Sequence, residues 1–168
     1  MAHNVDEVTM LGIRSRTAAF VIVSTLLIVG KSTAQEVGTC KADITSPKKG
    51  DSVSTSGDVR GTATVPPGMF LWVFSQREGL AKWWPQSGGP ARVRDGEWVV
   101  HAIYGDEKDP SKDAGANFVI TAVVVDQKAN DEIVKYVKKS ENDNYYPGMD
   151  LPAANPGCAS KDIIAKRR

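Results

Sequence analysis

The side chains that could support catalysis or metal binding are few in this chain. It contains two histidines and two cysteines among 168 residues. His101 lies in the alternating run EWVVHAIY, so we expect a half-buried sheet residue rather than a general base. The chain has no Gly-x-Ser-x-Gly elbow, no His-Glu-x-x-His motif, no phosphate-binding glycine loop and no dinucleotide fingerprint. The sequence therefore predicts a non-catalytic protein without cofactor or transition metal.

A short acidic loop is the candidate for a hard cation. Residues 106–113 read DEKDPSKD, and their carboxylates are the ligands that calcium prefers. The spacing does not fit an EF-hand, and two lysines are interleaved with the acids. We therefore expect a solvated connection between strands, and calcium binding is left to a melting experiment with calcium and chelator.

The two cysteines lie near the ends of the predicted domain, at Cys40 and Cys158. Export to an oxidising compartment favours a disulfide between them, and a pair of free thiols is the alternative. Neither cysteine has a second Cys or His within a few positions, as a zinc site needs. If the first and last strands pair in parallel, the two Cα atoms can approach the roughly 5 to 6 Å that a disulfide requires.

Two adjacent aromatic pairs, each followed by proline, are the candidate binding residues. They are Trp83 with Trp84, and Tyr145 with Tyr146. Such rings give a large contact area at little entropic cost. Neighbouring residues of a strand point to opposite faces, so one tryptophan should be buried. We expect this to be Trp84, which leaves Trp83, Tyr145 and Tyr146 as candidate partner-binding residues.

Residues 1–34 have the organisation of a secretory signal peptide. Two arginines precede an apolar run at 18–29, and small residues lead to a predicted cleavage after Ala34. The run is shorter than the roughly 20 apolar residues that span a bilayer, so an uncleaved anchor and a buried helix are the alternatives. Because two acids near the start are unusual in a signal peptide, we also expect that translation can begin at Met10.

Cleavage there would leave a short linker at 35–39 and one domain at 40–166, in a secreted or periplasmic location. The full chain carries 21 basic and 20 acidic side chains. The leader holds three of the former and two of the latter, which leaves 18 of each. A neutral domain gives no argument for nucleic-acid binding, and no membrane contact is expected unless the leader is retained.

Short apolar or alternating segments separated by Gly, Pro, Asp and Ser clusters are typical of an all-β sandwich. The expected strands are 40–45, 58–64, 69–75, 92–104 (a hairpin turning at Asp95-Gly96), 117–126 and 158–166. The segments 69–75 and 117–126 are apolar on both faces and should be central strands. The expected core face of the hairpin's second arm is Trp98, Val100, Ala102 and Tyr104, and Trp72 is also expected in the core.

The period of the pattern changes at about 128–140, where a helix is expected before the last strand. The apolar residues that lie on or near one helical stripe are Ala129, Ile133, Val134, Tyr136 and Val137. Lysines cluster in the expected last turn, where cations suit the helix dipole.

Several short motifs describe turns and core positions. They are Ile44-x-x-Pro47-x-x-Gly50, Val59-x-Gly61-x-Ala63, Leu71-Trp72-Val73, Trp84-Pro85-Gln86, Asp95-Gly96-x-Trp98 and Phe118-x-Ile120. The series resembles immunoglobulin-like modules of secreted or surface-exposed bacterial proteins over about residues 40–166. The resemblance implies a mainly-β immunoglobulin-like sandwich and no specific activity. Cys40 and Cys158 are too distant in sequence for the inter-sheet pair of antibody domains, so immune-type recognition is not carried over.

The function expected from these features is that of a secreted or periplasmic binding or adhesion module for a protein partner. A carbohydrate-binding module using exposed aromatics such as Trp84 with Tyr146 is one alternative. A small extracytoplasmic enzyme inhibitor presenting a rigid loop is another.

Overall fold

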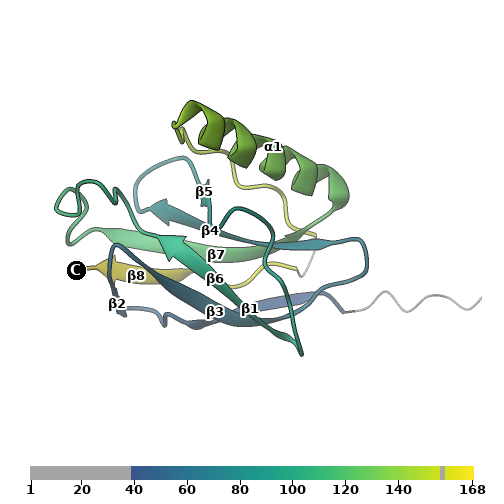
Figure 1. Ribbon diagram of the computed structural model, residues 1–168. Coiled ribbons are helices and arrows are strands. Elements are labelled where there is room, and N and C mark those ends of the chain that lie inside the picture. Colours follow the sequence, from purple (N-terminus) through teal and green to yellow (C-terminus); the bar gives the residue numbers. More distant parts are fainter. Residues whose placement is uncertain (1–38, 156–157) are drawn as a thin grey trace, which may run out of the picture. The chain divides into compact units, whose positions relative to one another are not determined.

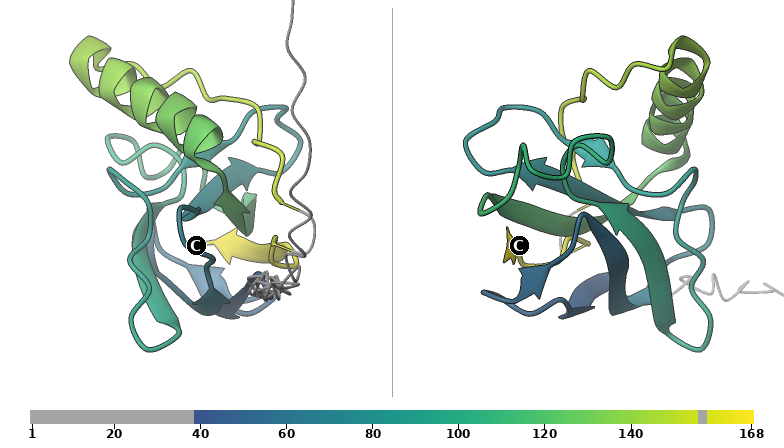
Figure 2. Two further views of the ribbon diagram at one scale, coloured as in Figure 1. Left: turned by 90° about the vertical axis from the view of Figure 1, so that its right-hand side faces the viewer. Right: turned by 60° about the vertical axis from the view of Figure 1, so that its left-hand side comes forward.

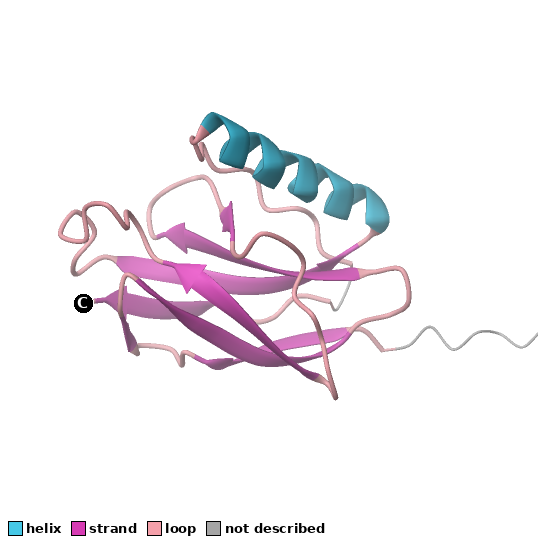
Figure 3. Cartoon of the chain, viewed as in Figure 1, coloured by secondary structure: helices cyan, strands magenta, loops and turns pink. Residues whose placement is uncertain are grey.

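The structure, a computed structural model, describes residues 39–155 and 158–168. The signal peptide expected at 1–34, the start at Met10 and nearly all of the linker lie outside the described residues. Two packed β-sheets and one helix form the described part (Figures 1 and 3). The elements are β1 (Lys41–Ser46), β2 (Ser52–Val53), β3 (Ser56–Thr64), β4 (Phe70–Arg77), β5 (Trp84–Pro85), β6 (Glu97–Ile103), β7 (Asn117–Val125), α1 (Gln127–Asp143) and β8 (Ile163–Arg167). The expected β-sandwich with one helix before the last strand is confirmed.

The chain changes sheets between β1 and β2. The three-stranded sheet has the order β1-β3-β6, and the five-stranded sheet has the order β2-β8-β7-β4-β5. β1 pairs antiparallel with β3, whereas β2 pairs in parallel with β8. The expected parallel pairing of the first strand with the last is therefore wrong for β1. The two-residue strand β2 is the one that pairs in parallel with the last strand, β8.

The strands β4 and β7 are buried on both faces, which explains their continuous apolar sequences. One face lies between the sheets, where Leu71 and Ile120 belong to the main core. The other face carries Trp72 and Phe74, and the helix α1 covers it (Figure 2). The two central strands expected from the sequence are thus confirmed.

The strand β6 shows the expected alternation. Trp98, Val100 and Ala102 are buried, and Tyr104 directly after the strand is buried with them. Asp95 and Gly96 have φ angles of 52° and 80°, as the expected two-residue turn requires. The first arm of the expected hairpin makes only isolated bridges, so residues 92–94 are not a strand.

His101 is exposed, and the expected half-burial is wrong. It lies on the outer face of β6, where no described element covers the three-stranded sheet. Its side chain is 61% exposed, and Nδ1 lies 3.5 Å from Oδ1 of Asp58. Asp58 also pairs with Arg60 at 2.7 Å. The Asp58–Arg60 pair is exposed to solvent, and exposed ion pairs of this kind add little stability.

Gly61 allows two elements of the three-stranded sheet to approach closely. A Cβ at this position would lie 2.0 Å from the carbonyl oxygen of Asp43 and 2.2 Å from the Trp98 ring. The Trp98 indole therefore lies directly over the glycine. The Val-x-Gly-x-Ala motif of β3 is explained by this contact, because any side chain at its centre would displace the ring.

The helix α1 begins after Asp126, whose Oδ1 accepts a hydrogen bond from the Ala129 N–H at 2.8 Å. Its C-cap is Asn144, which adopts the left-handed conformation with φ 49°. The buried side of the helix includes Ile133 and Val137, as expected. The prediction that lysines occupy the last turn is wrong, because the helix continues past them to Asp143.

The disulfide between Cys40 and Cys158 is confirmed, with a Cα–Cα distance of 5.1 Å. Cys40 directly precedes β1 of one sheet, while the Cys158 carbonyl accepts from the Val124 N–H of the other sheet at 2.9 Å. Cys158 also belongs to the buried cluster that contains Trp98. The bridge therefore links the two sheets, although the sequence separation argued against this. Because β8 begins only at Ile163, Cys158 does not start the last strand.

A disulfide of this kind indicates that the protein matures in an oxidising environment. Within residues 39–155 and 158–168, no helix is long and apolar enough to cross a bilayer.

Candidate functional site

The two aromatic-proline segments meet at one edge of the five-stranded sheet. Trp83 and Met149 form an antiparallel bridge, with N–H to O distances of 2.8 Å and 2.9 Å in the two directions. β5 pairs with β4 next to this bridge. Segments more than sixty residues apart are thus joined by main-chain hydrogen bonds. We call the four rings Trp83, Trp84, Tyr145 and Tyr146 the aromatic edge.

Side chains lock the two segments of the aromatic edge together. The Trp84 indole Nε1 donates to the main-chain oxygen of Tyr146 at 2.9 Å. Nζ of Lys82 lies 2.8 Å from Oδ1 of Asp150. Gly148 has φ +76°, and a Cβ there would lie 2.7 Å from Cβ of Lys82 and 3.0 Å from the Trp84 ring. Only glycine fits this close crossing without strain.

Trp83 and Trp84 are both half-buried, so the expected full burial of Trp84 is wrong. Trp83 packs against the cluster beneath the helix, which includes Trp72 and Phe74. Trp84 pairs with Ser75 and so lies on the opposite face of the sheet. The pleat does separate the two rings, but the helix covers the face that carries Trp83.

Tyr145 and Tyr146 present their rings to solvent. Their exposed fractions are 68% and 50%. Of the other exposed large hydrophobic residues, only Val99 is as exposed as Tyr146, also at 50%. The Tyr145 N–H donates to the carbonyl of Ser140 at 3.0 Å, directly after the helix cap. The two rings therefore project from a main chain that is held at both residues, by the helix end and by Trp84.

In the acidic loop at 106–113, the carboxylates of Asp106 and Asp113 accept hydrogen bonds from main-chain N–H groups of the same loop. Oδ1 of Asp106 accepts from the N–H groups of Lys108 and Asp109. Oδ2 of the buried Asp113 accepts from the Asp106 N–H at 3.1 Å, and Oδ1 lies 3.1 Å from Arg77. The hydrogen bond from Lys108 N–H lowers the pKa of Asp106. Among the described residues, no group of three His, Cys, Asp or Glu side chains is arranged to hold a metal ion.

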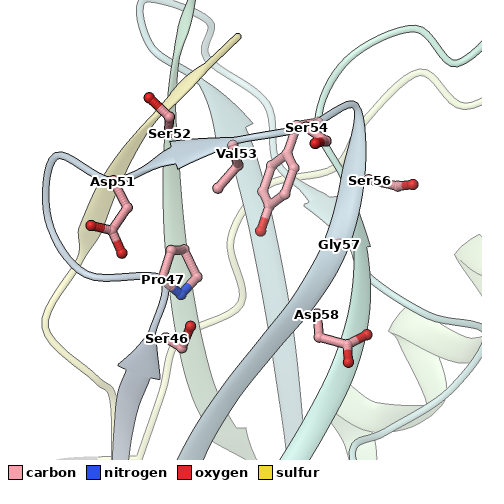
Figure 4. A pocket seen from close by; sticks show the side chains of 10 residues that line it. Ser46, Pro47, Asp51, Ser52, Val53, Ser54, Ser56, Gly57 and Asp58 are labelled. Carbon is pink, nitrogen blue, oxygen red and sulfur yellow. The ribbon is translucent and has the colours of Figure 1, made fainter.

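A pocket that sequence reasoning missed lies where β1 leaves β3. Its volume is about 390 Å³, and Figure 4 shows its lining around the turns before and after β2. The lining consists of Ser46, Pro47, Asp51, Ser52, Val53, Ser54, Ser56, Gly57, Asp58 and Tyr104. Alternation predicted that Tyr104 faces the core, but not that it lines a pocket. The serine-rich run SVSTS at 52–56 was the available signal for an irregular turn.

Neither a family model nor a curated protein matches the chain. What the geometry supports is a two-sheet β-sandwich with one helix, a disulfide between the sheets, an aromatic edge whose two tyrosines are exposed, and a separate pocket.

Proposed function

We propose that the protein is a secreted or periplasmic, non-catalytic binding module that recognises a protein partner through the aromatic edge. The observation that carries this proposal is the meeting of the two aromatic-proline segments, with Tyr145 and Tyr146 exposed on a fixed main chain. Tyrosine rings are frequent energetic centres of protein interfaces, because they bury a large area and lose few rotamers.

The strand order supports an immunoglobulin-like assignment for this module. In that nomenclature the three-stranded sheet corresponds to A, B and E, and the other sheet to A′, G, F, C and C′. The pairing of β2 with β8 corresponds to the A′–G contact, and α1 stands between F and G. Such sandwiches present loops and edges to partners on a rigid framework, so the C′ edge is a reasonable place for recognition.

Two features support an extracytoplasmic location. The disulfide needs an oxidising compartment, and the N-terminal sequence has the charge and hydropathy pattern of a secretory leader. N-terminal sequencing of the protein recovered from the culture medium and periplasm tests this part, and recovery only from the cytosol would contradict it.

The aromatic edge also argues against a sugar platform made by Trp84 with Tyr146. The Trp84 ring is half-buried, and its N–H is already bonded to the Tyr146 carbonyl. A pair of rings that stacks on a sugar needs one fully exposed face on each ring, and Trp84 is half-buried. The carbohydrate alternative therefore receives no support from this edge.

The experiment is affinity capture from the native envelope and secretome with the full chain, followed by a binding titration with the captured protein. The test variant is Tyr145→Ala with Tyr146→Ala. Because Trp84 bonds to the main-chain oxygen of residue 146, this variant keeps the lock between the segments. We expect at least a tenfold weaker affinity, as interface hot spots give.

The matched control is Val99→Ala, which removes an equally exposed apolar side chain from β6, in the other sheet. It should bind like the wild type. Equal binding by the tyrosine variant and the wild type would refute the aromatic edge as the binding surface, and capture of a glycan instead would refute the protein partner.

A further inference from the structure

The pocket beside β2 is bordered by an unpaired stretch of strand. β1 pairs with β3 only as far as Ser46 opposite Arg60, and the chain then crosses to the other sheet. β3 continues to Ser56, so no strand within residues 39–155 and 158–168 pairs with the stretch 56–59 on that side. At about 3.3 Å per residue this free edge is about 13 Å long.

The main-chain groups of two residues on this edge face the pocket. In an antiparallel ladder, alternate residues bond to opposite sides. Thr55 O accepts from Tyr104 N and the Ala63 N–H donates to Gly96, so odd-numbered residues of β3 face β6. Ser56 and Asp58 therefore direct their N–H and C=O groups away from β6, and both line the pocket.

Tyr104 supplies a further donor in the same pocket. Its side chain is 1% exposed, and its hydroxyl has no hydrogen-bond partner among the described residues. Its ring is fixed edge-on against Phe118, with centroids 5.7 Å apart. Burial raises the pKa of Tyr104 to about 12. A buried hydroxyl without a partner is uncommon in proteins and calls for an explanation.

The turn that forms the rim of the pocket is held in place before any ligand arrives. The Arg167 guanidinium donates to the Thr55 hydroxyl at 2.9 Å, and the Arg168 N–H donates to Val53 O at 3.0 Å. The Lys166 N–H donates to Asp51 O at 2.8 Å. A rim fixed in this way reduces the entropy that binding would cost.

We propose that this pocket takes a short extended peptide segment of three or four residues, which adds to the free edge of β3 as a strand. Its main chain would pair with Ser56 and Asp58, and one of its carbonyl oxygens would accept from the Tyr104 hydroxyl. This combination of alternating donors and acceptors along a strand edge is what an extended main chain complements.

The lining also defines which peptides fit. Pro47 and Val53 offer a small apolar surface for an inward side chain. Asp51 and Asp58 are the acids of the lining, and Oδ2 of Asp51 accepts from the Lys48 N–H at 2.8 Å. No basic side chain of the described chain lines the pocket. The segment should therefore carry a small apolar residue at its centre and no acidic residue. This site is separate from the aromatic edge, and its occupation does not depend on the function proposed above.

The test is an NMR titration of the full chain with the neutral probe acetyl-Thr-Val-Thr-N-methylamide. We expect the amide signals of Ser56 and Asp58 to shift, and an ester analogue that lacks the central N–H to bind more weakly. Tyr104→Phe, which removes only the hydroxyl, should weaken binding about two- to tenfold, as the loss of one hydrogen bond gives.

Tyr136→Phe is the matched control, since it removes a phenol hydroxyl from helix α1, whose residues do not line the pocket, and it should leave probe binding unchanged. An unchanged spectrum at millimolar peptide would overturn the proposal, and so would equal binding by wild type and Tyr104→Phe. If glucose shifted the same signals while the peptide did not, the ligand class would be wrong. None of these outcomes bears on the aromatic edge.

Discussion

The disulfide gives the sharpest quantitative prediction. The variant Cys40→Ala with Cys158→Ala removes a cross-link between residues 118 positions apart. In the chain-entropy relation, a closed loop of that length reduces the entropy of the unfolded chain enough to stabilise the fold by about 5 kcal/mol at room temperature. A domain of this size is typically stable by about 5 to 15 kcal/mol, so the variant should lose a third or more of its stability.

The assay is equilibrium unfolding in urea, followed by tryptophan fluorescence. The slope of the free energy against urea should rise in the variant, because an unfolded chain without the cross-link exposes more surface. Reduction of the wild-type protein should reproduce the variant's midpoint. This control separates the cross-link from the packing of the buried Cys158.

A loss below about 2 kcal/mol with an unchanged slope would refute the reasoning. It would mean that the unfolded chain is already restricted without the bridge. A loss of the full amount that reduction of the wild type fails to reproduce would instead assign the effect to the substituted side chains.

Three further predictions concern single residues. Gly61→Ala would place a Cβ 2.0 Å from the Asp43 carbonyl oxygen, so urea unfolding should show that the free energy of unfolding falls by about 3 kcal/mol or more. A decrease below about 1 kcal/mol would contradict the close packing at this glycine. The buried hydrogen bond from Trp72 Nε1 to Asn130 Oδ1 is 3.1 Å long. Asn130→Leu leaves the indole N–H unpaired, so it should lower the free energy of unfolding by about 1 to 3 kcal/mol. Equal urea midpoints of the variant and the wild type would contradict this prediction. Because burial raises the pKa of Tyr104 from 10.0 to about 12, the stability due to its neutral form is present below pH 10 and lost as the pH rises towards 12. The unfolding free energy should therefore fall more steeply with alkaline pH in the wild type than in Tyr104→Phe, and parallel curves would contradict it.

The local patterns of the sequence predicted the elements well. The alternation around Trp98 placed the core face of β6, and the change of period after Val125 placed the helix. The two-faced apolar runs identified β4 and β7 as central strands. These signals work because burial repeats with the geometry of a single element.

What the sequence did not predict depends on contacts between elements. His101 was expected to be half-buried because its neighbours are apolar, but no element of the described chain covers its sheet face. Trp83 packs against the cluster between the helix and the five-stranded sheet, and the pleat of one strand cannot reveal this packing. The crossing of the chain between sheets after Ser46 opens the pocket, and no local pattern marks where a strand stops pairing.

The candidate site shows the same division. The aromatic pairs were recognisable from their types and prolines, yet their meeting depends on a bridge between Trp83 and Met149 that joins two loops. Tyr104 was assigned to the core by alternation, and only the turn packed over it makes its hydroxyl part of a pocket.

The disulfide also determines how the sandwich responds to mechanical tension. A pulling force applied at Thr39 and Arg168 reaches Cys40 almost at once and passes through the sulfur–sulfur bond to Cys158. The span between the cysteines, which are 118 positions apart, holds seven strands and the helix and cannot be drawn out while the bridge is intact. Only the segment after Cys158 can be drawn out, and its resistance lies in the hydrogen bonds of β8 with β7 and β2. The domain would therefore lengthen by no more than about 35 Å under a force that leaves the bridge intact, because about ten residues extend by at most about 3.5 Å each.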